Sequence, residues 1–182
     1  MSRDDRAWVV LEDGLVLEAR SVAAPGTALG EMVFTTGMSG YQEAVTDPSY
    51  LGQVLCFTAP MIGNYGTGPA HEESARCWPG AVVMARAGDR GGAAGPVGWR
   101  AWLRARGAVA VEGCDTRRLV RHLRDRGAMR GGVSDALGPD ELLARVRAHP
   151  VLDGRDLAAE AAGAPRRVGD DGPRASSRST AG

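Results

Sequence analysis

The sequence predicts one domain of the α/β or α+β class, built from layers of strands and helices. Short apolar runs bounded by Gly, Pro or polar residues dominate the first half of the chain, and helical apolar patterns follow in the second half. A chain of 182 residues is long enough for one domain with a substantial core, and it is short for two. Strands that are followed by covering helices form layered domains of this class.

A hairpin is the first element that the sequence predicts. The apolar runs at residues 8–11 and 15–19 are joined through Asp13 and Gly14, a pair that readily supplies the positive φ angles of a tight turn. We expect further strands at residues 31–35, 53–59, 81–85 and 108–111, each of which is bounded by Gly, Pro or polar residues.

Three helices are predicted after residue 98. The first covers residues 99–106. The second starts at Asp115 or Thr116, either of which can cap it, and ends at Gly127. The third begins near Pro139, carries acidic residues in its first turn, and stops before Pro150.

Composition and charge exclude several classes of function. The 22 basic and 22 acidic residues balance, so no overall charge favours nucleic acid or an anionic membrane as a partner. No apolar run approaches the length of a membrane span. The N-terminus lacks the pattern of a secretory signal, and we expect a cytoplasmic protein. Every basic residue is Arg, so neither a Schiff-base lysine nor a P-loop lysine is available.

The thiol and imidazole side chains are scattered along the chain. Three cysteines, Cys56, Cys77 and Cys114, are odd in number and widely separated, which favours reduced thiols. Cys56 and Cys77 lack the small neighbours of a nucleophile elbow, and Cys114 follows Gly113 but precedes Asp115, which is better suited to cap a helix, so we expect structural roles for all three. His71 and Cys77 lack the spacing of zinc ligands, so we expect no metal site.

Two further motifs allow more than one interpretation. Glu72 and Glu73 are adjacent and usually diverge, which disfavours an acid–base pair. The stretch from residue 115 to residue 130 concentrates arginines, and it fits a solvated helix face, a protein interface or, less well, a nucleic-acid contact without aromatic stacking. These arginines are Arg117, Arg118, Arg121, Arg124, Arg126 and Arg130.

The stretch "MSGYQEAVTDPSY" combines tyrosines, a glycine, a proline and many hydrogen-bonding groups, which indicates a constrained loop whose shape matters. Within it, Asp47 precedes Pro48, whose fixed φ favours a turn with the Ser49 hydroxyl at its tip. That hydroxyl could bond to its own turn backbone or recognise a polar ligand. No His–Asp pair lies near it in the sequence, so a nucleophilic role is disfavoured.

These motifs occur in the order of a known family. The stretches "VLEDGLVLEARS", "GEMVFTTGMSGYQEAVTDPSYLGQ", "PMIGNYG", "EES", "DTRRLVRHLRDRGAMRGGVS" and "LDGRDLAAE" together resemble the amino-terminal domain of the small subunit of glutamine-hydrolysing carbamoyl-phosphate synthase. The resemblance extends from about residue 8 to residue 160.

The resemblance implies a swivelling β/β/α domain over residues 1–162. In the family this domain is fused to a glutaminase domain, and ammonia from glutamine passes to a large subunit that uses ATP and Mg²⁺ to make carbamoyl phosphate. Ser49 matches the family's serine that reaches the bound glutamine. The expected partners are therefore the large subunit, a glutaminase domain and glutamine, in a ligase that serves arginine or pyrimidine biosynthesis.

The resemblance also implies limits. We expect residues 163–182 to be a disordered tail, because they contain one large aliphatic residue and no aromatic residue. These 182 residues contain no Gly-x-Cys-x-Gly elbow, so we expect no glutaminase domain, no catalytic residue, no cofactor and no glutamine hydrolysis by this chain alone. The alternative is a stand-alone interaction or regulatory module, or a truncated relic without synthase activity.

Overall fold

The computed structural model describes residues 5–151 and places seven strands and four α-helices among them. The strands are β1 (Arg6–Leu11), β2 (Val16–Ser21), β3 (Thr27–Thr35), β4 (Gln53–Phe57), β5 (Ala81–Val83), β6 (Val109–Glu112) and β7 (Met129–Ser134). The helices are α1 (Tyr41–Thr46), α2 (Trp99–Ala105), α3 (Thr116–Arg126) and α4 (Pro139–Ala148), with short 3-10 turns η2 (Pro48–Tyr50) and η3 (Pro69–His71). The expected tail and domain end, residues 152–182, lie outside the described residues.

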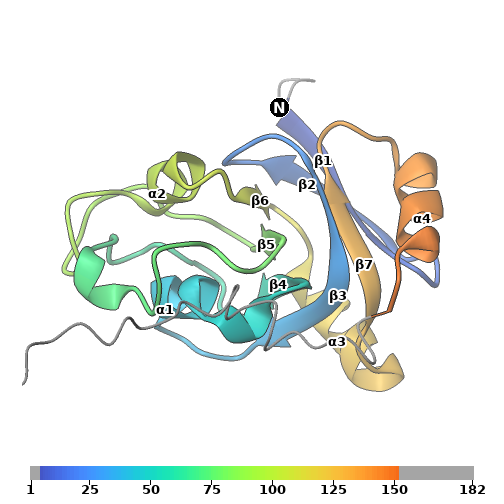
Figure 1. The fold of residues 1–182 in the computed structure, drawn as a ribbon, viewed down its shortest axis with the longest axis horizontal. Coiled ribbons are helices and arrows are strands. Elements are labelled where there is room, and N and C mark those ends of the chain that lie inside the picture. The colour runs from blue at the N-terminus through green and yellow to red at the C-terminus, as the bar shows by residue number, and fades with distance from the viewer. Residues whose placement is uncertain (1–4, 152–182) are drawn as a thin grey trace, which may run out of the picture.

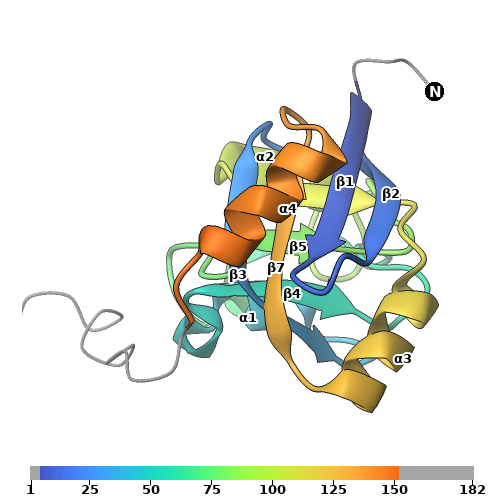
Figure 2. The ribbon, with the colours of Figure 1, turned by 90° about the vertical axis from the view of Figure 1, so that its right-hand side faces the viewer.

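The predicted mixture of strands and helices is confirmed, and the structure adds that the sheet closes on itself. The strand order is β1-β2-β6-β5-β4-β3-β7, and β7 pairs back to β1 to complete a barrel. Strands β3, β4, β5 and β6 are parallel to their neighbours in that run, whereas the other pairs are antiparallel. Helix α4 covers one side of the barrel, α1 and α2 lie on the opposite side, and α3 lies at one end (Figures 1 and 2).

Alternation along the strands divides the core into an inner part and outer parts. In β4, Val54 and Cys56 belong to the cluster inside the barrel, whereas Leu55 and Phe57 face the cluster under α1 and α2. In β1, Val10 points outward to α4. Because neighbouring side chains of a strand point to opposite faces, one strand supports two hydrophobic clusters, and continuous apolar runs result.

The predicted hairpin is confirmed. β1 and β2 pair antiparallel, and Gly14 between them adopts a φ of 96°. The Asp13 carboxylate accepts a hydrogen bond of 3.2 Å from the backbone N–H of Leu15, and the backbone N–H of Gly14 donates to the carbonyl of Leu11 at 2.9 Å. Gly14 therefore supplies a positive φ as predicted, whereas Asp13 does not and instead stabilises the turn through its carboxylate.

The helices at 116–126 and 139–148 are also confirmed. The Asp115 carboxylate caps α3 by accepting from the N–H of Arg118 at 2.9 Å, and Gly127 ends the helix with a φ of 90°. Pro139 opens α4. These ends could be predicted because capping signals lie next to them in the sequence.

Strand β7 was not predicted, because two adjacent glycines are unusual within a strand. A Cβ at Gly131 would lie 2.9 Å from a methionine methyl, that of Met32, inside the barrel. A Cβ at Gly132 would lie 2.8 Å from the Val146 side chain of α4. The two glycines thus let β7 pack closely on both of its faces.

The glycine-rich loop at residues 86–98 packs closely against residues 62–68. The backbone N–H of Thr67 donates to the Val97 carbonyl at 3.0 Å. A Cβ at Gly92 would lie 2.5 Å from the backbone of Tyr65. In the facing segment Gly63 adopts a φ of 84°. Within residues 5–151 no helix has the length and apolar character needed to cross a bilayer.

Glu112 of β6 joins β2, α2 and the loop that contains Ala87. Its carboxylate pairs with Arg20 of β2 and, at 2.8 Å, with Arg100 of α2, and it accepts from the N–H of Ala87 at 2.8 Å. Burial alone would raise the pKa of Glu112, but the Ala87 N–H and the two guanidinium groups outweigh burial and lower that pKa. The buried carboxylate therefore stays ionised.

We predict that Glu112→Gln lowers the free energy of unfolding by about 3 kcal/mol, because it leaves two guanidinium groups without their buried anion. The difference in unfolding free energy between the native chain and the variant should have its full size above the usual glutamate pKa of 4.5. It should shrink as pH falls below that value and the carboxylate of the native chain is protonated. Urea unfolding between pH 3 and pH 8 measures this. Glu141→Gln, which removes an exposed pair with Arg145, is the control, and an equal loss in both variants would contradict the prediction.

Candidate functional site

The D-P-S-Y turn directly follows α1 and forms η2. The Asp47 carboxylate accepts from the backbone N–H of Ser49 at 2.9 Å, and the Asp47 carbonyl accepts from the N–H of Tyr50 at 3.2 Å. Pro48 occupies the first position of η2, where its fixed φ suits the turn. The turn is therefore shaped by its own sequence, as was predicted.

Ser49 lies at the exposed tip of this turn. Asp47 binds its backbone N–H, and the Ser49 hydroxyl makes no hydrogen bond to any other residue within 5–151. The turn is thus stabilised by the Asp47 carboxylate and not by the serine side chain. A hydroxyl in this position can donate to, and accept from, an incoming polar group.

Helix α1, which carries the turn, begins among stacked aromatic rings. Gly40, with a φ of 78°, precedes the helix and donates its N–H to the Tyr65 hydroxyl at 2.7 Å. The Tyr41 hydroxyl donates to the Gly66 carbonyl. The centroid of the Tyr41 ring lies 4.3 Å from that of the Tyr65 ring, on which it stacks, and 4.8 Å from that of the tilted Trp99 ring. Burial raises the pKa of Tyr41 to about 12, so this hydroxyl stays protonated as a donor. The helix was not predicted, because six residues are too few to show a helical period.

Gln42 fixes the first turn of α1 to the loop before η3. Its amide is fully buried, and its nitrogen donates to the Gly68 carbonyl at 2.9 Å while its oxygen accepts from the Gly68 N–H at 3.0 Å. The same nitrogen donates to the Glu72 carboxylate at 3.1 Å. All of these bonds join segments that are more than 25 residues apart in the sequence.

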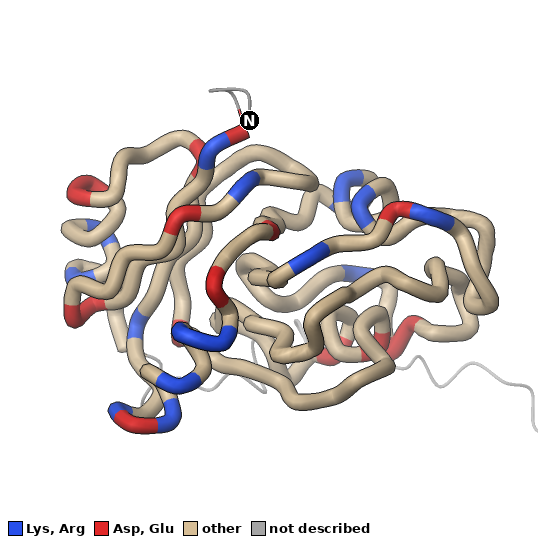
Figure 3. Tube along the Cα trace, turned by 180° about the vertical axis from the view of Figure 1, so that it is seen from behind, with Lys and Arg blue, Asp and Glu red and all other residues tan. Residues whose placement is uncertain are grey.

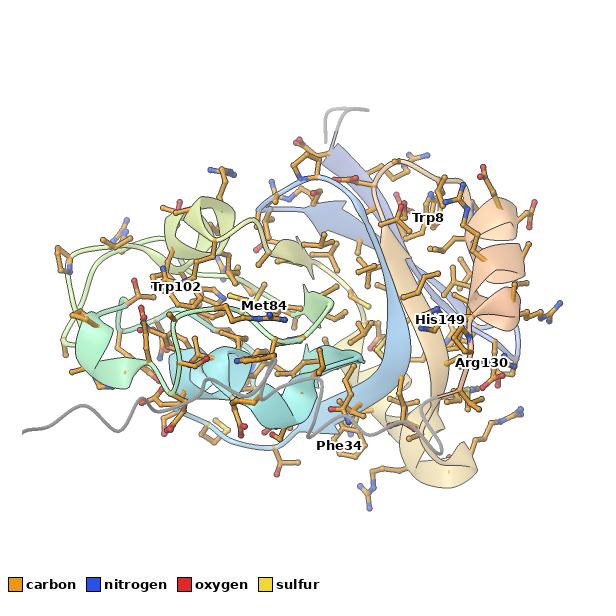
Figure 4. The ribbon with its side chains drawn as sticks, viewed as in Figure 1. Trp8, Phe34, Met84, Trp102, Arg130 and His149 are labelled. Atoms are coloured by element: carbon orange, nitrogen blue, oxygen red, sulfur yellow. The ribbon has the colours of Figure 1, made fainter. Side chains whose placement is uncertain are left out.

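The two carboxylates at positions 72 and 73 diverge, as expected. Glu72 pairs with Arg106 and accepts from the Trp102 ring nitrogen at 3.3 Å, beside α2. Glu73 is exposed and contributes its backbone N–H, which donates to the Thr46 hydroxyl at 2.9 Å. Glu72 therefore serves as a structural anion, and the pair has no geometry for joint acid–base chemistry. Figure 4 shows Trp102 and Met84 in the part of the molecule that contains α1 and α2, whereas Arg130 and His149 lie together near α4.

The three cysteines are free thiols. Cys56 and Cys114 are buried and Cys77 is half-buried. Burial raises the pKa of Cys77 to about 11 and that of Cys114 to about 12, and it raises the pKa of Cys56 as well. A thiol with such a pKa is protonated at neutral pH and is a poor nucleophile.

Among the described residues, no three His, Cys, Asp or Glu side chains are grouped so as to hold a metal ion.

The arginines of the 115–130 stretch divide into two sets. Arg126 pairs with Asp13 at 3.3 Å, and Arg130 lies on β7, where it donates to the Glu12 carboxylate. The other four are exposed on α3 and form no salt bridge with a carboxylate of residues 5–151; these are Arg117, Arg118, Arg121 and Arg124. We call these four the α3 arginine face. Figure 3 shows several blue segments, with red between them, at the end of the molecule where α3 lies.

A groove runs beside the α3 arginine face. It has a volume of about 460 Å³ and is lined by Thr58, Thr116, Arg117, Val120, Arg121 and Arg124. Cationic side chains flank two hydroxyls and one apolar residue, and unpaired guanidinium groups favour carboxylate partners. The groove therefore suits an acidic surface.

Comparison with known proteins places this geometry in a family. The family model described as "Carbamoyl-phosphate synthase small chain, CPSase domain" matches residues 9–133. The carbamoyl phosphate synthase small chain of Nitratidesulfovibrio vulgaris strain Miyazaki F is 45% identical over 159 residues, which cover 84% of this chain and 41% of that protein. The small chain of Streptomyces coelicolor is 47% identical over 166 residues, which cover 86% of this chain and 42% of that protein.

The chain thus spans less than half the length of these relatives. Among solved structures, an aminopeptidase from Aneurinibacillus sp. strain AM-1 aligns with a TM-score of 0.39 and 16% identity over 71% of this chain and 30% of that chain. That likeness is too low to bear on fold or function.

We predict that Gln42→Ala lowers the free energy of unfolding by about 3 kcal/mol, because it removes three hydrogen bonds and leaves the backbone of Gly68 without a buried partner. Urea unfolding of the full chain measures this. Gln53→Ala on β4 is the matched control, since the half-buried Gln53 side chain forms no hydrogen bond within 5–151 and should cost far less. Equal losses would show that the amide of Gln42 does not anchor α1.

Proposed function

The chain belongs to the family of carbamoyl-phosphate synthase small chains, and from this premise we propose that its D-P-S-Y turn forms one wall of a glutamine site. The chain would support glutamine-dependent supply of ammonia to a large subunit that makes carbamoyl phosphate. The observation that carries the proposal is the Ser49 hydroxyl, which is exposed at the tip of a fixed turn and has no described partner.

Glutamine hydrolysis requires a reactive nucleophile, and the three thiols of this chain do not meet that requirement. An activated nucleophile is needed to attack the amide, and the thiols of Cys56, Cys77 and Cys114 have raised pKa values. We therefore assign the hydrolytic nucleophile to a glutaminase domain outside these 182 residues. Ser49 would hydrogen-bond to a polar group of the glutamine from across the domain boundary. The ATP and Mg²⁺ sites belong to the large subunit in this proposal.

The barrel and its covering helices also support the finer fold assignment, the swivelling β/β/α domain of the family, as a proposal. The β4–β6 face with α1 and α2 would form the side toward the glutaminase domain, since Ser49 follows α1. The opposite side is covered by α4.

The α3 arginine face supports the second part of the proposal, the contact with the large subunit. Four exposed guanidinium groups in one short helix repel one another, and a partner that supplies carboxylates would offset this repulsion. We propose that the groove beside α3 receives an acidic segment of the large subunit. If the chain were a stand-alone module, it would bind the large subunit or glutamine without restoring synthesis.

We predict that Ser49→Ala raises the KM for glutamine about fivefold in an assembly of this chain with a glutaminase and the large subunit, because one hydrogen bond of about 1 kcal/mol is lost. Synthesis from free ammonia should be unchanged, because it bypasses the glutamine site. Ser39→Ala, which removes another exposed hydroxyl, is the control. An unchanged KM for Ser49→Ala would refute the role of Ser49.

We predict that Arg121→Glu weakens association with the large subunit at least tenfold at low salt, and that added salt reduces the difference between this variant and the native chain. Arg145→Glu reverses the same charge on α4, away from the groove, and should bind normally. Titration calorimetry at two salt concentrations measures both. Equal binding by the two variants would assign the α3 arginine face to solvent.

A further inference from the structure

The segment Glu72 to Ser74, the "EES" motif of the sequence, contacts the last turn of α1, immediately before the D-P-S-Y turn. We propose that Thr46 and Ser74 are positioning residues that set the place of the Ser49 hydroxyl. We call their contact the helix-end brace. The part of this inference that concerns glutamine rests on the function proposed above, whereas the part that concerns the turn does not.

Thr46 is fully buried at the end of α1, and both its hydroxyl and its carbonyl are engaged. The hydroxyl donates to the Gln42 carbonyl at 2.8 Å and accepts from the Glu73 N–H at 2.9 Å. The carbonyl accepts from the Ser74 hydroxyl at 2.7 Å. The last turn of the helix is thus tied both to its own first turn and to a distant segment.

Ser74 is itself held in place. Its hydroxyl accepts from the ring nitrogen of Trp78 at 2.7 Å while it donates to Thr46, so the donor and one acceptor position are both used. The backbone N–H of Trp78 donates to the Val45 carbonyl at 3.0 Å. Arg76 stacks on the Trp78 ring, 3.8 Å from its centroid. Residues 74–78 therefore contact α1 at two successive carbonyls.

The other end of the motif is anchored on α2. Glu72 accepts from the Gln42 amide, pairs with Arg106 and accepts from Trp102. Arg106 stacks on Trp102, 3.9 Å from the ring centroid. The segment is thus fixed to α2 before it reaches Thr46, which makes it a rigid support.

A helix as short as α1 needs such support. The last carbonyls of a helix lack partners within the helix, and an isolated helix of six residues is not stable in water. At the end of α1 the backbone N–H of Asp47 donates to the Ala44 carbonyl over a long distance of 3.4 Å, so this bond is weak. The bonds from Ser74 and Trp78 satisfy the carbonyls of Thr46 and Val45 instead.

A shift of Thr46 would move Ser49 directly. Only Asp47 and Pro48 separate the two residues, and both are constrained, by the bond of Asp47 to the Ser49 N–H and by the fixed φ of proline. The turn therefore has little freedom to compensate for a displaced helix end. The brace determines where the hydroxyl is presented.

The first test is amide hydrogen exchange of the full chain. Ser74→Ala should speed exchange of the Ser49, Tyr50 and Leu51 amides about fivefold, because one hydrogen bond at the helix end is lost. Ser74→Thr retains the hydroxyl and should restore slow exchange. The control is Ser21→Ala on β2, which removes a comparable hydrogen bond, the one of 2.7 Å from the Ser21 hydroxyl to the Asp135 carboxylate. This variant should leave the exchange of these amides unchanged. Unchanged exchange in Ser74→Ala would overturn the inference, whatever the function of the chain.

The second test is the glutamine dependence of the reconstituted synthase. Ser74→Ala should raise the KM for glutamine, leave synthesis from ammonia unaltered, and be rescued by Ser74→Thr. If Ser49→Ala raises the KM and Ser74→Ala does not, the inference is overturned while the proposed function stands. If neither variant raises it, the proposed function fails, and the exchange experiment still decides whether the brace fixes the turn.

Discussion

The closure of the barrel by β7 is the constraint on which the rest of the structure depends. β7 pairs with β1 on one side and with β3 on the other. Without it, the β1–β2 hairpin would be joined to the remaining strands only by the short β2–β6 contact, in which Arg20 lies opposite Glu112. Gly131 and Gly132 permit this closure because neither side of β7 has room for a Cβ.

Closure of the barrel also determines what its outer faces carry. Leu55 and Val82 point outward from two parallel strands and form the floor on which α1 and α2 pack. The two helices are then joined through Gln42, Glu72 and Arg106, and the end of α1 presents the D-P-S-Y turn. A hydroxyl at the surface is thus supported by a series of contacts that begins on the outer face of the barrel. Such support is what a binding residue needs if another domain is to complete the site.

The sequence predicted the elements whose signals are local. The β1–β2 hairpin and the ends of α3 are set by residues within a few positions of each turn or cap. β7 and α1 depend on contacts with distant segments, so neither propensity nor period revealed them. The D-P-S-Y motif singled out Ser49, and the predicted turn with Ser49 at its exposed tip is confirmed, whereas its contact with glutamine stays a prediction. The role of Ser74 could not be predicted, because its partner Thr46 is 28 residues away, although the "EES" motif did mark the segment.

The central claim is that Ser49 faces a glutamine site completed by a second domain. It is tested most directly by the reactivity of the thiol introduced by Ser49→Cys, followed at position 49 alone by peptide mass spectrometry. The native thiols of Cys56 and Cys114 are buried and that of Cys77 is half-buried, whereas position 49 is exposed. The rate of alkylation by iodoacetamide is measured in the complex with the glutaminase, with and without glutamine. The account predicts that glutamine slows the reaction in the complex and has no effect on the chain alone. A rate in the complex that is independent of glutamine would contradict it.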